Sequence, residues 1–353
     1  MSTRNVVLFI SHKFGERIMG SYCDICRHLP DEQYDVVWVV ASDSFDRSEL
    51  PENVNARYYV SEDLATLGYT PIENTLIPGS PHFIPLRFFL DNPHYRHYWF
   101  IEYDVMFTGR WSTLMEDCDS ILGGYDFLSC HIERFGEDNR QWPWWYRSND
   151  CGYALEECVK GFNPICRYSN RALALLDSYM KEGHSAHSEV MITTCLHNHG
   201  MKIGDIGGMG EFTPDGYRNR YYIKGVGTNN GTMRWRPPFT MEEVEALGTK
   251  NRLFNNGNCY WESVTTYCYI RDFRRNRQAL WGECFWNNYS ALWYCSGYLG
   301  YVVLAHYIRV HINWSQRKRL AVGTAYFVVG AAFSAWSFWW KAVPGVTMDT
   351  LEQ

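Results

Sequence analysis

The first 45 residues contain two short apolar runs with a helix-patterned segment between them. NVVLFISH (5–12) and YDVVWVVAS (34–42) have the β-branched and large apolar composition of buried strands. The intervening segment GERIMGSYCDICRHL (15–29) carries apolar residues at the spacing of an amphipathic helix. The order strand, helix, strand predicts the β-α-β unit of a parallel sheet.

Polar residues follow each of these strands. Ligands of parallel sheets bind beyond the carboxyl ends of the strands, which places SHKFG (11–15) and ASDS (41–44) at the binding edge. We therefore expect Ser11, His12, Ser42 and Asp43 to contact a bound nucleotide. No GxGxxG or Walker-type glycine loop follows the first strand, which argues against a dinucleotide-binding fold or a P-loop NTPase.

The segment YRHYWFIEYDVMFTGRW (95–111) contains an aromatic strand that ends on two carboxylates before a glycine. In a strand over residues 98–105, Glu102 and Asp104 point to one side of the sheet and Tyr103 points to the other. A buried, unpaired carboxylate loses several kcal/mol on leaving water. Two carboxylates at the end of a buried strand therefore suggest a partner such as a divalent cation.

The pattern downstream predicts another strand, a polar loop and two helices. The strand is GGYDFLSCHIE (123–133). SNRALALLDSYM (169–180) has helical spacing behind a Ser169 cap, and HSEVMITTCLHNHG (187–200) opens a second helix with Ser188 as its cap. Glu189 then lies in the first helical turn, where a carboxylate also complements the helix dipole. Residues 204–238 are rich in glycine, asparagine and proline and predict loops and a lid.

Three tryptophans, Trp142, Trp144 and Trp145, lie in the polar loop over residues 134–150. Exposed indoles beside a ligand-binding edge offer flat apolar faces to the C–H groups of a sugar, so we expect them to bind an acceptor. The alternative is that they cover the core.

The C-terminal part of the chain is more apolar. LAVGTAYFVVGAAFSAWSFWW (320–340) is uncharged over the length that spans a bilayer as a helix, and QRKR (316–319) precedes it. A second apolar run, residues 291–308, has basic clusters on both sides, which suits a helix lying in the membrane interface. The alternative is a helical hairpin packed on the preceding domain. We expect a domain over residues 1–270 and a helical, membrane-associated segment over 271–353.

Composition excludes some classes of protein. A chain of 353 residues with 46% hydrophobic and 20% charged residues can bury a full core. Its net charge of -6 argues against a general nucleic-acid binder, which needs a basic field. The 12 cysteines include one CxxC without a second pair to complete a zinc site. The N-terminal apolar run of about six residues is too short for a signal peptide, so we expect a reducing cytoplasm.

Several of these segments together resemble a family of poorly characterised bacterial and fungal proteins related to GT-A glycosyltransferases. The resemblance is carried by YWFIEYDVMFTGRW, by YDFLSCHIE with WPWWY downstream, by R-x-S before a helix, and by HSEVMITTCLHNHG, all within residues 95–200. It implies an α/β fold with a Rossmann-like, mostly parallel sheet flanked by helices. In that fold a short acidic motif at a strand end holds Mn2+ or Mg2+ against the diphosphate of a nucleotide-sugar. EYD would be this motif, with Asp104 as a metal ligand and Glu102 as a second ligand or a ribose contact.

The resemblance also implies catalytic roles. An inverting transfer needs a general base for the acceptor hydroxyl, and the HSE turn would supply Glu189 as the base and His187 as an orienting donor. Asp150 and Glu133 are the next candidates for the base. A retaining enzyme would not use Glu189 in this way, and the sequence does not decide between the two mechanisms.

One segment departs from the family pattern. Members of the family carry a late HPVK-like segment whose His completes the metal site and whose Lys touches phosphate, and RLFNNGNCYW (252–261) lacks both. Lys224 or Arg252 would then meet the phosphates. The expected function is hexosyltransferase-like: metal-assisted transfer from a nucleotide-sugar to a glycan or lipid-linked acceptor at the cytoplasmic face of a membrane. A catalytically inactive sugar- or nucleotide-binding protein and a membrane-anchored scaffold are the alternatives.

Overall fold

A computed structural model describes residues 4–77, 80–224, 231–233, 239, 241–255 and 318. The chain divides into two compact units, Met1–Ser263 and Val264–Gln353, and all described residues except Lys318 belong to the first. The predicted domain boundary at residue 270 and the apolar runs 291–308 and 320–340 lie outside the described residues. Within the described part of the chain, every helix is too short or too polar to cross a bilayer.

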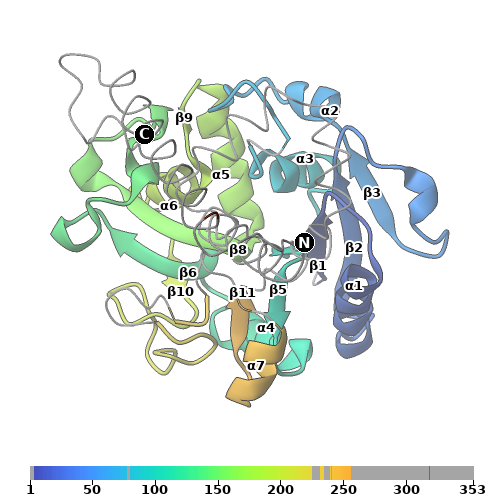
Figure 1. Cartoon of the computed structure of the whole chain (residues 1–353). Helices are drawn as coiled ribbons and strands as arrows, with labels where there is room; N and C mark the ends of the chain where they lie inside the picture. The colour runs from blue at the N-terminus through green and yellow to red at the C-terminus, as the bar shows by residue number, and fades with distance from the viewer. Residues whose placement is uncertain are drawn as a thin grey trace. The chain divides into compact units, whose positions relative to one another are not determined.

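A seven-stranded sheet forms the centre of the first unit, in the order β10-β6-β8-β4-β1-β2-β3 (Figure 1). β1 is parallel to β2 and β4, β2 to β3, and β10 to β6, whereas β8 runs antiparallel between β4 and β6. The predicted α/β fold with a mostly parallel sheet is confirmed. The strands are β1 (Asn5–Ser11), β2 (Tyr34–Ala41), β3 (Ala56–Tyr59), β4 (His97–Glu102), β6 (Phe127–Arg134), β8 (Val159–Ser169) and β10 (Ile203–Asp205).

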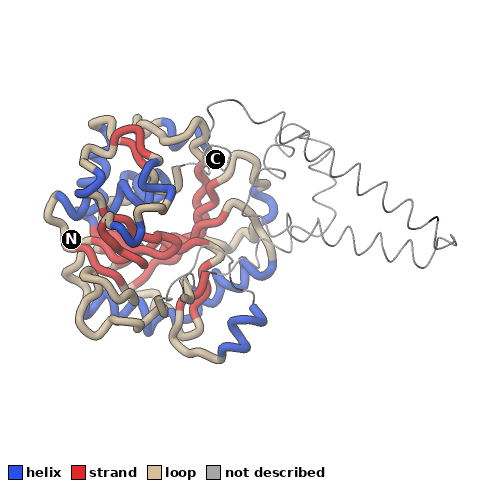
Figure 2. Tube along the Cα trace, turned by 60° about the vertical axis from the view of Figure 1, so that its left-hand side comes forward, coloured by secondary structure: helices blue, strands red, loops and turns tan. Residues whose placement is uncertain are grey.

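Helices cover both faces of this sheet (Figure 2). Along β1, Val6, Leu8 and Ile10 pack on one side, with α2 (Ser61–Ala65), α3 (Phe83–Asp91), α5 (Asn170–Lys181) and α6 (Ser188–Asn198). Val7 and Phe9 pack on the other side, with α1 (Glu16–His28) and α4 (Trp111–Ile121). We call these the α5 side and the α1 side. Because β1 is buried on both faces, its apolar residues run without alternation.

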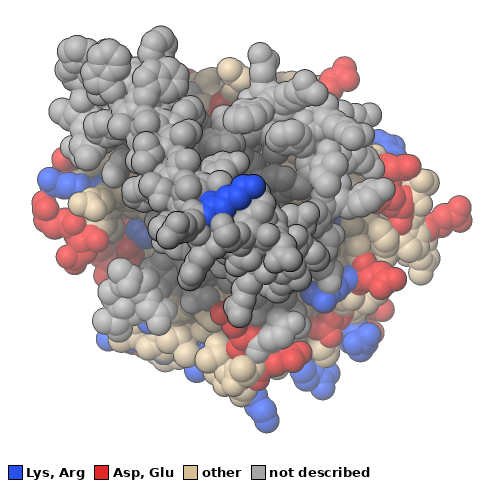
Figure 3. All heavy atoms as spheres, viewed as in Figure 1, with Lys and Arg blue, Asp and Glu red and all other residues tan. Residues whose placement is uncertain are grey.

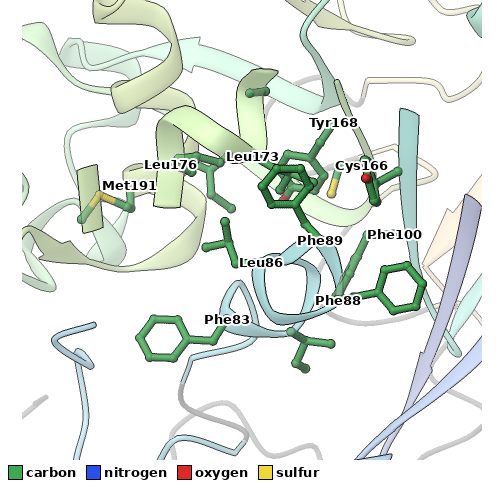
Figure 4. Close-up of a cluster of buried hydrophobic side chains, with 14 of the residues drawn as sticks. Phe83, Leu86, Phe88, Phe89, Phe100, Cys166, Tyr168, Leu173, Leu176 and Met191 are labelled. Atoms are coloured by element: carbon green, nitrogen blue, oxygen red, sulfur yellow. The ribbon is translucent and has the colours of Figure 1, made fainter. Parts of the chain in front are cut away.

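Helix α3 is apolar around most of its circumference, as its sequence FIPLRFFLD requires of a buried helix. Figure 4 shows Phe83, Leu86 and Phe89 of α3 beside residues of α5 and of strands β4 and β8. This packing fixes Phe100 of β4 and Tyr168 of β8, and the same two side chains line a cavity beside the end of β4.

The two predicted helix starts differ in outcome. The hydroxyl of Ser169 accepts a hydrogen bond from the backbone N–H of Ala172 at 3.1 Å, as predicted for the cap of α5. The cap of α6 is His187, whose Nδ1 accepts from the N–H of Glu189 at 3.4 Å. The prediction of Ser188 as the cap was therefore wrong by one residue.

The described part of the predicted lid is packed into the body of the protein. Tyr217, Tyr221 and Tyr222 are buried in the core on the α1 side. Asp205 at the end of β10 accepts hydrogen bonds from the N–H groups of Gly207 and Gly208 and from the Tyr222 hydroxyl. These bonds fix the chain after β10 against the core, and residues 225–230 and 234–238 of the predicted lid lie outside the described residues.

Acidic and basic side chains are intermixed on the described surface that is visible in Figure 3.

Smaller elements lie around the sheet. β5 (Val105–Phe107) pairs with β11 (Leu253–Asn255), and β7 (Ser148–Asp150) pairs with β9 (Ser185–Ala186), both antiparallel. The other helices within residues 4–255 that the structure describes are α7 (Met241–Leu247) and the short 3-10 helices η1 (Arg47–Glu49), η2 (Glu137–Asn139), η3 (Pro143–Tyr146) and η4 (Leu155–Glu157).

Candidate active site

The acidic motif lies where β4 ends beside β1. β4 stops at Glu102, Tyr103 and Asp104 form a turn, and β5 begins at Val105, so the strand is shorter than the predicted 98–105. Tyr103 packs into the core on the α1 side, away from Glu102, as predicted. The chain runs from β1 to β2 and later returns to β4 on the other side of β1, and strand order reverses at this point. Ligands of α/β sheets bind at such reversals.

A cavity of about 390 Å³ lies beside the end of β4. Its walls come from β4, β8, the residues around the starts of α3 and α6, and the segment that contains η3. Four carboxylates line it: Glu73, which pairs with Arg147, and Glu102, Asp104 and Glu189. The structure thus brings the two predicted metal ligands and the predicted base into one cavity, although α6 is far from β4 in the sequence.

Burial raises the pKa of Glu102, Asp104 and Glu189. The pKa of Glu102 is raised well above its ordinary value by burial and by the nearby charges of Asp104 and Glu189. Burial raises the pKa of Asp104 to about 6. It raises the pKa of Glu189 to about 8, although Lys160 and the backbone N–H of Asn163 act in the opposite direction. An acidic cavity of this kind favours either bound protons or a bound cation.

The side chains at the end of β4 fit a hard cation. Oδ1 of Asp104 is buried and has no hydrogen-bond partner among the described residues, which is costly unless a ligand occupies that position. In the described ranges, no three His, Cys, Asp or Glu side chains are grouped as a complete metal site. Mg2+ is usually held by one or two carboxylates, with phosphate oxygens and water completing its shell. Glu102 and Asp104 therefore fit a cation that a phosphate ligand shares.

His187 holds the start of α6 in place. Its ring stacks on Trp144, with centroids 4.5 Å apart and planes at 3°, and its backbone N–H donates to the carbonyl of Arg147 at 2.9 Å. Burial, with a contribution from the charge of Arg147, lowers the pKa of His187 to about 4, so the ring is neutral at neutral pH. Because Nδ1 accepts from the Glu189 N–H, the neutral ring carries its proton on Nε2, and this atom is the one that can act as the predicted donor.

The three tryptophans have different surroundings. Trp144 lines the cavity and already carries His187 against its ring. Trp145 is buried and donates from its indole N–H to the carbonyl of Asn139 at 2.9 Å, so it covers the core and presents no face to an acceptor. Trp142 packs edge-on against Trp145, with centroids 5.1 Å apart, and lies outside the cavity lining.

The four residues predicted to bind a nucleotide lie near strand ends, outside the cavity lining. Ser11 is buried, and its hydroxyl donates to the carbonyl of Lys13. The Asp43 carboxylate accepts from the N–H and the hydroxyl of Ser61, both at 2.6 Å, and so fixes the start of α2. Ser42 accepts from a backbone N–H two residues on, and the His12 ring lies edge-on to Tyr103.

The basic residues expected to meet phosphate also lie outside the cavity lining. Lys224 forms an ion pair with Glu133, and the guanidinium of Arg252 donates to the carbonyl of Arg220. Burial alone would raise the pKa of Glu133, but Lys160 at 3.1 Å and Lys224 outweigh it and lower the pKa to about 2. A carboxylate with so low a pKa is a poor base.

Asp150, the other alternative base, also lies outside the cavity lining. Its side chain is exposed and accepts a hydrogen bond from the N–H of Gly152 at 2.8 Å. Glu189 is therefore the one of the three candidate bases that lines the cavity.

The cavity is also lined by five polar residues that were not predicted as site residues: Glu73, His82, Arg147, Asn163 and Asn255. Glu73 and Arg147 form an ion pair at 2.7 Å. The Asn-Pro dipeptide at 163–164, inside a strand-like segment, was a usable signal of an irregular backbone. Asn255 lies in the segment 252–261 and Arg147 in the loop 134–150, but no local pattern singles out these two residues, or Glu73 and His82, as cavity residues.

No protein-family model and no curated protein matches the sequence. Among solved structures, an active-site mutant of LgtC is 12% identical, over 61% of this chain and 82% of that chain, with a TM-score of 0.38. Mouse xyloside xylosyltransferase 1 is 11% identical, over 58% and 84%, with a TM-score of 0.34. The 4-diphosphocytidyl-2C-methyl-D-erythritol synthase of Anaerococcus prevotii is 9% identical, over 59% and 90%, with a TM-score of 0.36. These likenesses are distant.

Proposed function

We propose that this chain is a metal-assisted glycosyltransferase, which moves a sugar from a nucleoside-diphosphate donor to a hydroxyl of a glycan or lipid-linked acceptor. One observation carries the proposal. Glu102 and Asp104 at the end of β4 and Glu189 at the start of α6 converge on a single cavity, at the point where strand order reverses.

The carboxylates at the end of β4 suit the donor side of this reaction. Cleavage of the bond between the sugar and the diphosphate leaves negative charge on the leaving group, and a bound Mn2+ or Mg2+ neutralises such charge. Glu102 and Asp104 would hold that cation. A cavity lined by carboxylates repels a diphosphate when it holds no cation, so donor binding depends on the metal.

Glu189 suits the acceptor side. In an inverting transfer, the acceptor oxygen forms a bond to the anomeric carbon while the bond to the diphosphate breaks, and the hydroxyl proton passes to the Glu189 carboxylate. A carboxylate whose pKa is raised by burial is a stronger base than an exposed one, once it is ionised. Glu189 lies in the first turn of α6 with only 15% of its side chain exposed, which restricts its position.

The lack of an HPVK-like segment favours the alternative of an inactive binding protein. However, the segment that replaces it reaches the cavity through Asn255, which is buried at the end of β11. Its amide can supply a neutral oxygen, a ligand type that hard cations accept. Association with a membrane, location at its cytoplasmic face and the choice of a glycan or a lipid-linked acceptor remain predictions from the sequence.

A panel of nucleotide-sugars tests the proposal, with Mn2+ in one arm and a chelator in the other, scored for binding and for slow donor hydrolysis. We expect at least one donor to bind and to be hydrolysed with Mn2+ and neither to occur with the chelator. Binding without hydrolysis would favour the inactive binding protein. The absence of binding to every donor in both arms would contradict the proposal.

A further inference from the structure

We propose that Asn163 and His82 form a subsite that binds hydroxyl groups of the acceptor sugar beside Glu189. The identification of the bound sugar as the acceptor rests on the proposed function. The subsite itself is defined by two buried side chains that line the cavity from different elements. Asn163 comes from β8, and His82 directly precedes α3.

The side chain of Asn163 is only partly satisfied within the protein. The residue is 9% exposed, and its Oδ1 accepts from the hydroxyl of Ser129 at 2.6 Å. Its Nδ2 is buried without a hydrogen-bond partner among the described residues. A buried amide donor left unpaired costs free energy, so a ligand oxygen in the cavity would be bound favourably there.

An irregularity in β8 sets this orientation. The pairing of β8 with β6 shifts around Phe162, and the pairing with β4 ends at Ile165. Asn163 and Pro164 lie in between, and a proline has no N–H for a sheet hydrogen bond. Irregularities of this kind re-aim side chains beside functional sites, and here Asn163, Phe162 and Pro164 all reach the cavity wall.

His82 presents a matching group from another wall. The residue is 6% exposed, and its Nδ1 has no hydrogen-bond partner in the described part of the chain. Burial, with a smaller contribution from His187, lowers its pKa to about 3, so the ring is neutral. A neutral imidazole offers one donor and one acceptor, which is also what a hydroxyl group offers.

Both residues lie near α6, which carries Glu189. His82 and Ile192 of α6 line the same wall, and the backbone N–H of Asn163 acts on the Glu189 carboxyl and lowers its pKa. The expected ligand is uncharged and rich in hydroxyls because neither Asn163 nor the neutral ring of His82 carries a charge. It would lie beside the base, whereas the diphosphate would lie at Glu102 and Asp104.

The test uses the full chain and the variants Asn163→Leu and His82→Phe, which remove the hydrogen-bonding atoms and keep much of the bulk. Thr213→Val is the matched control, because Thr213 also has a buried hydroxyl without a partner among the described residues but lies outside the cavity lining. Saturation-transfer NMR with glucose, galactose, N-acetylglucosamine, mannose and xylose measures sugar binding. Calorimetry with nucleoside diphosphates and Mn2+ measures binding at the donor side.

We expect wild type and Thr213→Val to bind at least one sugar, and each cavity variant to bind it roughly tenfold more weakly, the usual scale for one lost hydrogen bond. Binding of the diphosphate should be unchanged. If Asn163→Leu does not fold, Asn163→Asp is used in its place. This variant removes the Nδ2 donor but keeps the shape of the side chain and an oxygen that accepts from Ser129. Equal sugar binding by wild type and both cavity variants would overturn the subsite, as would a wild type that binds none of the sugars. If wild type binds no nucleoside diphosphate but the sugar results are as expected, the proposed function is overturned and the subsite is still supported.

Discussion

The imidazole of His187 lies flat on the indole of Trp144, with centroids 4.5 Å apart and planes 3° from parallel. The same imidazole caps α6 by accepting from the N–H of Glu189. The turn that carries the candidate base is thus held by a stacked ring and a helix cap together.

This arrangement predicts a graded effect of substitutions at His187. His187→Asn loses the stacked ring but keeps a good capping side chain, whereas His187→Ala loses both. We expect the alanine variant to be less stable than the asparagine variant by about 1 kcal/mol, the usual value of a cap. Urea denaturation of the two variants measures the difference, and equal stabilities would show that the cap contributes nothing.

Glu189→Gln should lower turnover by roughly 100-fold or more while leaving donor affinity nearly unchanged, because general-base catalysis is worth about that factor. Glu211→Gln is the control, since Glu211 forms an exposed ion pair with Arg134 outside the cavity lining. Steady-state kinetics and donor binding separate the two effects. Normal turnover in Glu189→Gln would assign the base to another group.

The buried carboxyls predict how stability depends on pH. Because the pKa of Glu189 is about 8 in the folded protein and 4.5 by its ordinary value, the folded state holds a proton between these pH values that the unfolded state has released. Stability should therefore fall as pH rises from about 4.5 to 8, by up to about 1.4 kcal/mol per pH unit. Glu102 and Asp104, whose pKa values are also raised, act in the same direction.

Melting temperatures of the chelator-treated protein across this pH range test the prediction. Glu189→Gln should have a flatter profile than wild type, because glutamine does not titrate. A wild-type melting temperature that rises with pH over this range would contradict the raised pKa values.

A buried ion pair on the α1 side predicts a large effect on stability. Arg167 is fully buried, donates to Asp119 at 2.8 Å, and also donates to the carbonyls of Cys118, Leu122 and Tyr125. Arg167→Met should cost about 3–5 kcal/mol, because it leaves the Asp119 charge without this partner. The exposed Arg134→Met should cost less than about 1 kcal/mol. Denaturant unfolding compares the two, and similar costs would refute the distinction.

The sheet was predictable where burial is uniform. β1 and β2 have continuous apolar runs because helices cover both faces of the sheet, and such runs are visible without tertiary information. The acidic end of β4 was predictable for the opposite reason, since two carboxylates beside an apolar strand are out of place unless they have a partner.

The surroundings of single side chains were not predictable from local pattern. Asp43 and Lys224 satisfy their charges with Ser61 and Glu133, residues far away in the sequence. Trp145 fills a small core with Cys158 and Val190, which no local signal in its loop indicates. His82 and Asn163 line the cavity because α3 and β8 pack beside β4, and this tertiary arrangement leaves no signal in the local sequence.

In the proposed reaction, Asp104 helps to hold a cation on which diphosphate binding depends. Asp104→Asn removes the charge at nearly constant shape, and it can even stabilise the metal-free protein by removing a buried, unpaired carboxylate. Asp138→Asn makes the same change of charge at an exposed position in η2 and serves as the control.

Calorimetry with UDP and GDP, in the presence of Mn2+ and in the presence of a chelator, is the most direct measurement. Wild type and Asp138→Asn should bind at least one of the two nucleotides with Mn2+ and neither nucleotide with the chelator. Asp104→Asn should bind neither nucleotide, whether Mn2+ or the chelator is present. Equal affinity of wild type and Asp104→Asn for the same nucleotide in the presence of Mn2+ would contradict the metal site and the glycosyl-transfer mechanism built on it.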